Sequence, residues 1–167
     1  MTLSTRVRAA SRGRHEEGAA LVEFIGLALI LLIPLVYLTI TVGRVQAGAF
    51  AAESAARDAA RGAVVAGVAA LEAGDSVSSA RARAWQRAGD ISAVVVQDFG
   101  FDADDHSSLS LSCSSTPCFE QGSVVSSRVD VHVALPGIPG FVHAIAPVEV
   151  TVSAHSRSPV DGLAGSP

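Results

Sequence analysis

A long apolar segment with one acidic residue inside it constrains this chain more than any other feature. From Ala19 to Val42 the only charged side chain is that of Glu23. As a helix the segment is about 36 Å long, which is enough to cross a hydrocarbon core of about 30 Å with some tilt. A chain of 167 residues can hardly bury such a run on all sides within its own fold. The segment therefore predicts a single membrane-spanning helix.

The charges that flank the apolar segment predict its orientation. Four arginines precede it, whereas only Arg44 follows closely; the four are Arg6, Arg8, Arg12 and Arg14, set against Glu16 and Glu17. Positively charged flanks stay on the cytoplasmic side of a membrane. We therefore expect a single-pass protein of the cytoplasmic membrane with its amino terminus inside. Pro34 removes a backbone donor within the span, and we expect a helix kink there.

Glu23 is the unusual residue of the span. A carboxylate at the bilayer centre costs about 2.5–3.5 kcal/mol on insertion scales, and less near the interface. Glu23 lies roughly 6 Å along the helix axis from Ala19, so tolerance in the headgroup zone is one interpretation. The other is that a neighbouring subunit neutralises the carboxylate. A free amino terminus created at Ala19 would be a suitable cation.

The residues around Glu23 also resemble a known family. Gly18 followed by AALVEF resembles the peptidase site of type IV pilin-like proteins. The longer sequence GAALVEFIGLALILLIPLVYL, followed by AAESAARDAARGA, resembles the TadE/TadG-like pseudopilins of tight-adherence (Flp) pilus systems. The resemblance covers most of the chain and is sharpest between Gly18 and Arg61.

This resemblance implies a function and a set of partners. It implies that a prepilin-type peptidase cuts after Gly18, and that the freed, methylated amine of Ala19 pairs with Glu23 of a neighbour. The implied partners are this peptidase, other pilins and pseudopilins of the same pilus, an inner-membrane assembly platform and the lipid bilayer. After processing, the chain would become extracellular as part of a pilus that serves adhesion or secretion.

The predicted fold class is α+β and pilin-like. A long transmembrane helix continues into an alanine-rich helix, followed by a short second helix and a small antiparallel sheet. The expected parts are a basic leader (1–18), a transmembrane and assembly helix (19–42), an alanine-rich helical extension (43–73), an extracytoplasmic α+β domain (74–155) and a disordered tail (156–167). Within the extension, the spacing predicts the ion pairs Glu53–Arg57 and Asp58–Arg61.

Turn residues and hydrophobic periodicity divide the α+β domain. Gly74 and Asp75 end the long helix, and Ser76 can cap the next one. We expect a helix over 77–88, a buried β-branched strand over 91–96, an acidic loop over 100–108, and strands over 109–113, 123–135 and 147–154. The sequence PGIPG at 136–140 predicts a turn before the last strand.

Two cysteines lie in the carboxyl-terminal part of the chain. Cys113 and Cys118 are outside the cytoplasm on the predicted topology, and an oxidising exterior favours a local disulfide. Two free thiols are the alternative. A metal site is less favoured, because two cysteines without paired histidines do not complete a tetrahedral ligand set.

The rest of the sequence gives little support for enzymatic or nucleic-acid chemistry. Residues 43–167 hold eight arginines and thirteen acids, and the chain has no lysine, so nucleic acid is a poor electrostatic match. The sequence Gly-Asp-Ser at 74–76 superficially resembles a hydrolase nucleophile region, but helix capping explains it better. The acidic loop with Asp102, Asp104, Asp105 and His106 lacks the EF-hand pattern, and His132 and His143 lack ligand spacing. We expect no enzyme, no cofactor and no metal site.

The leading hypothesis is therefore a minor pilin or pseudopilin of a tight-adherence pilus. One alternative is a permanent single-span anchor that carries an extracytoplasmic binding domain. Another is a secreted protein cut after Ala49, since Ala-Gly-Ala at 47–49 matches a small-x-small peptidase site. The apolar run is longer than the usual signal-peptide core of about 7–15 residues, which counts against the last alternative.

Overall fold

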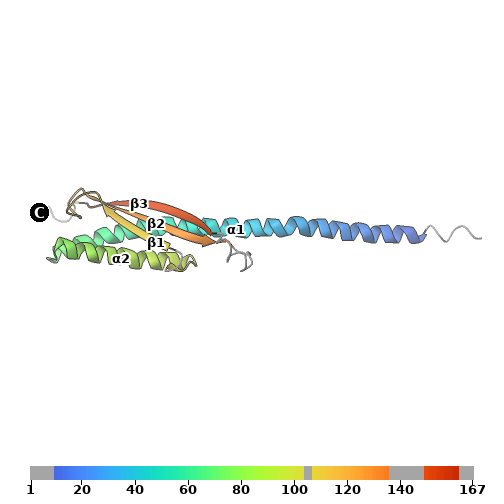
Figure 1. Cartoon of the computed structure of the whole chain (residues 1–167), viewed down its shortest axis with the longest axis horizontal. Helices are drawn as coiled ribbons and strands as arrows, with labels where there is room; N and C mark the ends of the chain where they lie inside the picture. The colour runs from blue at the N-terminus through green and yellow to red at the C-terminus, as the bar shows by residue number, and fades with distance from the viewer. Residues whose placement is uncertain (1–9, 104–106, 136–148, 162–167) are drawn as a thin grey trace, which may run out of the picture. The chain divides into compact units, whose positions relative to one another are not determined.

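A computed structural model of the chain describes residues 10–103, 107–135 and 149–161, with side chains from residue 19 onward. Four predicted features lie outside these residues: the start of the leader, the centre of the acidic loop, the PGIPG turn with His143, and the end of the tail. The first element, α1, extends over Ala10–Glu72, and the described residues divide into two compact units at Thr41 and Val42. Each unit is described by itself below, with its elements labelled in Figure 1.

The first unit contains the amino-terminal part of α1. Its large apolar side chains are all exposed, with Leu31 72% and Tyr37 40% accessible. The helix is long and apolar enough to cross a membrane. Pro34 lies inside the helix, and Thr39 Oγ1 donates a hydrogen bond to the carbonyl of Leu35 at 2.9 Å. The apolar helix predicted from the sequence is confirmed, whereas the kink at Pro34 stays a prediction.

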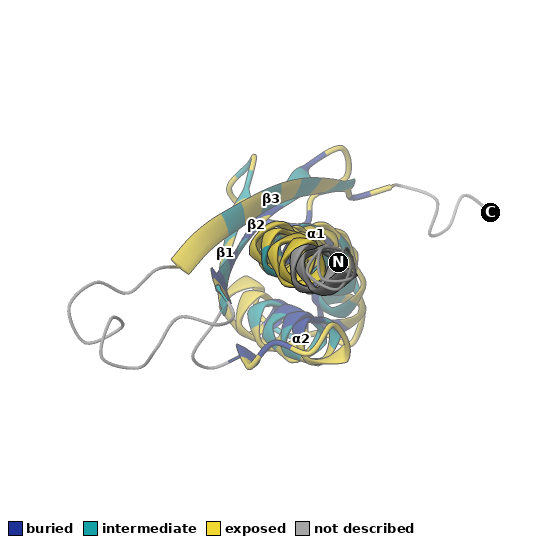
Figure 2. Ribbon diagram, turned by 90° about the vertical axis from the view of Figure 1, so that its right-hand side faces the viewer, coloured by how far each residue is buried: buried dark blue, intermediate teal, exposed yellow. Residues whose placement is uncertain are grey.

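The second unit packs two helices against one face of an antiparallel sheet. The carboxyl-terminal part of α1 and helix α2 (Val77–Asp98) lie beside each other on that face, as Figure 2 shows, and residues of both helices share the core with the sheet. The sheet has the order β1-β2-β3 and consists of β1 (Ser107–Cys113), β2 (Val124–Ala134) and β3 (Glu149–Pro159). This architecture confirms the predicted α+β fold, with two helices and a small antiparallel sheet.

The core of this unit combines alanines of α1 with valines of the sheet. Seven alanines of α1 are completely buried: Ala51, Ala52, Ala55, Ala56, Ala59, Ala60 and Ala63. On β2, Val125, Val129, Val131 and Val133 face the same core. Ser127 shares that face, and its hydroxyl donates a hydrogen bond of 2.5 Å to the carbonyl of Ala56. Small helix residues thus let the sheet approach the α1 backbone closely.

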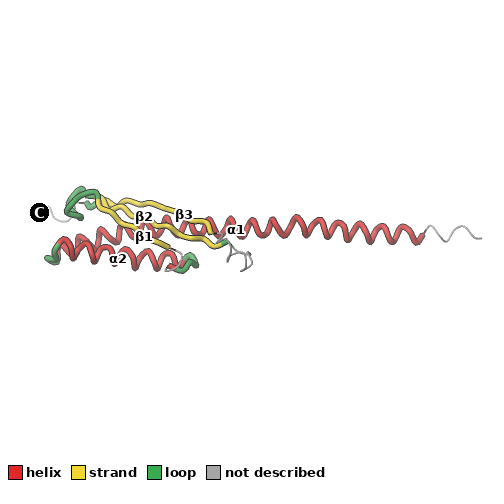
Figure 3. The backbone as a smooth tube through the Cα atoms, viewed as in Figure 1, coloured by secondary structure: helices red, strands yellow, loops and turns green. Residues whose placement is uncertain are grey.

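The predicted strand over 91–96 is wrong, because this segment belongs to α2. Figure 3 shows α2 as a single helix up to Asp98. The buried residues of α2 recur every four positions, and they are Ala80, Ala84, Ala88, Ser92 and Val96. This helical spacing continues through Gly89 and Asp90. Packing of one helix face therefore overrides the local β preference of the valine run.

The edges of the predicted strands also need correction. β1 begins at Ser107, inside the region expected to be a loop, and β3 continues to Pro159, inside the region expected to be a disordered tail. The extension of β3 pairs with β2, where Arg157 lies opposite Ser126. Val160 is buried next to it, and its N–H donates to the carbonyl of Ser123 at 2.8 Å.

Two glycines of α1 have packing roles. A Cβ at Gly62 would collide with the side chain of Ile91 on α2, and a Cβ at Gly67 would collide with the ring of Phe119. Phe119 is buried and has a φ of 72°, in the left-handed region that non-glycine residues rarely adopt. Its ring makes an edge-to-face contact with Trp85, with a centroid distance of 6.3 Å. Gly62 therefore allows α2 to approach α1 closely, and Gly67 allows the ring of Phe119 to do so.

Candidate functional site

The segment with the predicted processing site lies within α1. Its backbone is helical at Gly18 and Ala19, and the side chains of Ala19 and Glu23 are exposed. None of the described side chains pairs with the carboxylate of Glu23. Within this part of the chain, Glu23 therefore presents an acid on an apolar helix surface.

The apolar surface around Glu23 is not covered by any of the described residues. Val22 is 70%, Phe24 68% and Leu27 68% accessible. A continuous apolar surface of this kind is unstable in water and fits lipid or the helices of other subunits. Together with the length of the segment, this exposure fits a membrane-anchored, single-pass protein.

The predicted disulfide is confirmed. Cys113 and Cys118 are joined, with their Cα atoms 5.7 Å apart. Cys118 is buried and belongs to the same core cluster as Phe119, which covers Gly67 of α1. The sequence predicted the bridge but not this contact with α1. The disulfide thus closes a structural loop in the core of the second unit.

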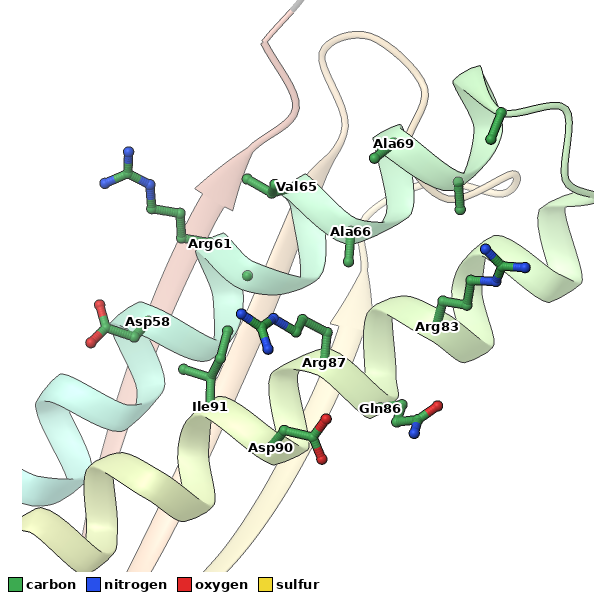
Figure 4. A pocket seen from close by; sticks show the side chains of 13 residues that line it. Asp58, Arg61, Val65, Ala66, Ala69, Arg83, Gln86, Arg87, Asp90 and Ile91 are labelled. Carbon is green, nitrogen blue, oxygen red and sulfur yellow. The ribbon is translucent and has the colours of Figure 1, made fainter.

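A groove between α1 and α2 is the largest cavity that we describe, with a volume of about 830 Å³ (Figure 4). Its floor consists of small and apolar residues, which are Gly62, Val65, Ala66, Ala69, Ala70, Ala73 and Ile91. Its polar rim consists of Asp58, Arg61, Arg83, Gln86, Arg87 and Asp90. Sequence reasoning did not find this groove. The only sequence signal for the groove is an acid and an arginine three residues apart in each helix, Asp58 with Arg61 and Asp90 with Arg87.

The predicted helix pairs on α1 have different outcomes. Arg57 Nη2 lies 2.6 Å from Glu53 Oε1, as predicted. The predicted Asp58–Arg61 pair does not form. Neither side chain takes part in any of the described ion pairs. Both instead extend at the rim of the groove (Figure 4).

The outer face of the sheet carries a polar network. The carboxylate of Asp130 accepts hydrogen bonds from Arg128 Nε at 3.0 and 3.1 Å and from the hydroxyl of Ser153. Arg128 and then Ser153, through these hydrogen bonds, hold the pKa of Asp130 below its ordinary value. Next to this network, His132 Nδ1 and Thr151 Oγ1 form a hydrogen bond of 2.9 Å. His132 therefore lies on the outer face of the sheet.

The Gly-Asp-Ser sequence at 74–76 has the capping role expected for it. Ser76 is the N-cap of α2, and its hydroxyl accepts a hydrogen bond from the N–H of Ser79 at 3.3 Å. Asp75 forms an ion pair with Arg83 at 3.2 Å. Over residues 10–103, 107–135 and 149–161, no group of three or more His, Cys, Asp or Glu side chains is arranged to hold a metal ion.

Comparison with known proteins identifies one part of the chain. The family model "TadE-like protein" matches residues 18–61, from the glycine of the predicted peptidase site to an arginine of the alanine-rich helix. No curated protein and no solved structure gives a match. The matched segment coincides with the one in which the sequence resemblance was sharpest. Residues 18–61 of this chain are thus similar to the TadE-like family.

Proposed function

We propose that this chain is a membrane-anchored minor pilin or pseudopilin of a tight-adherence pilus. The main support is that its TadE-like segment contains an apolar span, residues 19–42, with exposed side chains and with Glu23 as its only acid. Such a helix suits two environments in turn, because both lipid and the helices of other subunits can cover it. We expect it to assemble with other pilins and pseudopilins on an inner-membrane platform.

Processing after Gly18 would give Glu23 a charged partner. The cut by a prepilin-type peptidase would free the amine of Ala19 at the start of an exposed apolar helix. Each subunit would then carry one cation and one anion roughly 6 Å apart along the same helix. An axial offset between neighbouring subunits places the amine of one beside Glu23 of the next. This pairing would remove the cost of an isolated carboxylate in an apolar environment.

The proposed orientation places the amino terminus in the cytoplasm. The arginines before the span support this orientation, and the Cys113–Cys118 disulfide agrees with an extracytoplasmic location of the second unit. In this proposal the chain is a structural and assembly subunit, not an enzyme.

A cut after Ala49 is less compatible with the packing of the second unit. Gly48 is buried and lies so close to Val133 of β2 that a Cβ would collide with that side chain. Ala51 and Ala52 follow in the core. A secreted form that starts at Phe50 would lose a residue that helps α1 to pack on the sheet.

The amino terminus of the mature protein tests the proposed processing. The intact mass and terminal sequence are measured on protein from native membranes, with and without the pilus peptidase. A peptidase-dependent start at Ala19 supports the proposal, a start at Met1 indicates a permanent anchor, and a start at Phe50 indicates secretion. Gly18→Val should block the cut. Gly26→Val is the matched control, because a Cβ at Gly26 meets nothing within 4 Å.

The role of Glu23 in assembly is tested separately. Glu23→Ala should leave membrane insertion and cleavage intact but reduce capture of partner pilins and piliation. Glu53→Ala is the control, because it removes an exposed acid from the same helix outside the apolar span. Unchanged piliation by the Glu23→Ala protein would contradict the charge-pairing mechanism without affecting the assignment of the cleavage site.

A further inference from the structure

β3 forms an open margin of the sheet. Its 11 residues pair with β2 on one side, and no described strand pairs with them on the other (Figure 2). Just past the end of the strand, the N–H of Val160 donates to the carbonyl of Ser123. Backbone groups alternate in direction along an antiparallel pair, so the even-numbered residues of β3 direct theirs to β2. The odd-numbered residues direct theirs to the open side, and these include Thr151, Ser153, His155 and Arg157.

This edge has few of the features that usually keep strands from pairing. Pro159 is the only proline of β3 and stands at its last position. The register with β2 has no bulge over the whole strand. No Asp, Glu, Lys or Arg lies between Glu149 and Arg157. Because natural edge strands are commonly short, bulged, charged or covered, an uninterrupted edge of this length is a template for a further strand.

The two charges of β3 specify the partner strand. Glu149 and Arg157 are exposed, and neither takes part in any of the described ion pairs. They share the outer face of the sheet with Ser153 and lie four residues on either side of it. In an antiparallel pair of two β3 strands centred on Ser153, Glu149 of each copy is therefore opposite Arg157 of the other. A shift of the register by two residues in either direction separates both charge pairs.

We propose that the open edge of β3 pairs with the same edge of a second copy, antiparallel and related by a two-fold axis at Ser153. The contact is self-complementary, as an isologous interface requires. In this register the odd-numbered residues are opposite one another, so their outward-directed backbone groups can form the hydrogen bonds of an antiparallel ladder. On the inner face, Val152 of one copy is opposite Ala154 of the other, and both residues already pack at the margin of the core.

The direction of α1 along the sheet determines which copies can make this contact. Gly48 of α1 packs on Val133, whose partner on β3 is Val150, near the start of the strand. Ala56 of α1 contacts Ser127, whose partner lies farther along β3. α1 therefore runs in the direction of β3 and enters the second unit at the start of that strand. Because the two-fold axis reverses one copy, the two α1 helices enter the joint sheet from opposite ends.

Opposite entry points fit copies on two facing membranes or filaments, since copies anchored in one membrane enter from the same side. This step rests on the proposed extracytoplasmic location of the second unit. A contact along one strand is smaller than a standard interface, so a single pair of copies binds weakly. Two surfaces that each carry many copies form many such contacts at once, and the avidity compensates for the weak single contact.

Two populations of lipid vesicles that carry the full-length chain test this contact. The chain carries Ser153→Cys, with a different tag in each population, and the vesicles are oxidised after mixing. We expect an adduct with both tags, because directly opposite Cα atoms of a hydrogen-bonded antiparallel pair are about 5.5 Å apart, a distance that a disulfide can bridge. The native cysteines are joined to each other and do not compete. Ser110→Cys is the matched control and should give no adduct, because Ser110 is exposed on β1, at the opposite margin of the sheet.

Charge reversal gives the decisive measurement, in chains that also carry Ser153→Cys. Glu149→Arg sets the introduced arginine against Arg157 of the other copy at both ends of the contact. Arg157→Glu likewise sets an acid against Glu149. Each variant alone should lower the yield of the adduct about fivefold, because two favourable cross-strand pairs become unfavourable. Vesicles of one variant mixed with vesicles of the other should restore the yield, which also shows that both variants fold.

Three outcomes would overturn the proposal. They are equal yields with Ser153→Cys and Ser110→Cys, an adduct confined to copies of one vesicle population, and a mixed pair whose yield stays as low as that of either variant alone. The vesicles contain no peptidase and no other pilin. A start at Met1 in cells would therefore contradict the proposed processing and leave this contact unaffected.

Discussion

The two parts of α1 belong to one helix but use opposite kinds of side chain. Up to Thr41 the helix carries large apolar residues such as Leu31 and Ile33, all of them exposed. Beyond Val42 alanine is its commonest residue, and seven of these alanines are completely buried. Large apolar side chains thus face away from the chain itself, whereas small ones form its core.

This difference shows that the size of a helix residue reflects what covers the helix. Lipid tails and loosely packed helices accommodate large side chains of many shapes. A sheet and a second helix on two sides of α1 leave space only for a methyl group or a hydrogen atom, as at Ala59 and Gly67. The alanine-rich part is therefore specialised for packing within the chain, and the amino-terminal part for an environment outside it.

A charge in the middle of the span should separate the two parts most strongly. Leu31→Arg places an arginine near the centre of the apolar segment, which costs about 2.5–3.5 kcal/mol of insertion free energy. We expect a large loss of the membrane-integrated fraction, measured by alkaline extraction. Val65→Arg, also on an exposed valine of α1 but beyond the span, should integrate normally. Equal integration of both variants would show that Leu31 does not face lipid.

A larger side chain in the alanine-rich part should affect folding instead. Ala59→Leu adds three carbon atoms at a completely buried position, and overpacking of this kind costs about 1–3 kcal/mol of folding stability. Urea unfolding of the full chain in detergent micelles, followed by the fluorescence of Trp85, measures the change. Ala69→Leu is the same substitution at an exposed position and should have little effect. A comparable loss in both would mean that burial does not explain the choice of alanine.

The same distinction explains which parts of the fold could be predicted from the sequence. The span and β2 were predictable because their patterns extend over many residues and depend on one partner, either the bilayer or the core. The segment from Ile91 to Val96 was not, because six β-branched or small residues fit a strand or a helix equally well by themselves. Its helical state follows from the buried face of α2, where Ser92 and Val96 continue the four-residue spacing of the buried alanines before them.

The candidate site was predictable in part for a similar reason. Gly18 and Glu23 belong to a local motif that can be recognised from consecutive residues, and the family match covers it. The groove combines Asp58 and Arg61 with residues of another helix. Only the alignment of α1 with α2 brings these charges together. The local spacing predicted an Asp58–Arg61 ion pair, and it did not indicate the surface to which both side chains belong.

Loss of the disulfide should destabilise the second unit without affecting the span. Replacing Cys113 and Cys118 together by serine opens a short loop, and the loop entropy corresponds to about 2 kcal/mol of folding stability. We expect a lower urea midpoint by Trp85 fluorescence, because the loop holds Phe119 against Trp85. Membrane integration should be unchanged. A simultaneous loss of integration would show that the two parts of α1 do not act separately.

The smallest expected effect concerns acid stability, and it again involves only the second unit. The hydrogen bond from Arg128 lowers the pKa of Asp130 in the folded protein, with a further contribution from Ser153. The unfolded chain therefore binds this proton at a higher pH than the folded chain, near the ordinary value of 3.8. The resulting stability is present above that pH and is lost as the pH falls through the lower folded pKa. Both side chains are partly exposed, so solvent screening keeps the effect small.

Asp130→Asn should therefore lose less stability than the unaltered chain between neutral and acidic pH, measured by urea midpoints of the Trp85 signal. The control Asp98→Asn should lose as much stability as the unaltered chain. If both variants lose stability with pH as the unaltered chain does, the network on the outer face of the sheet does not contribute to acid stability.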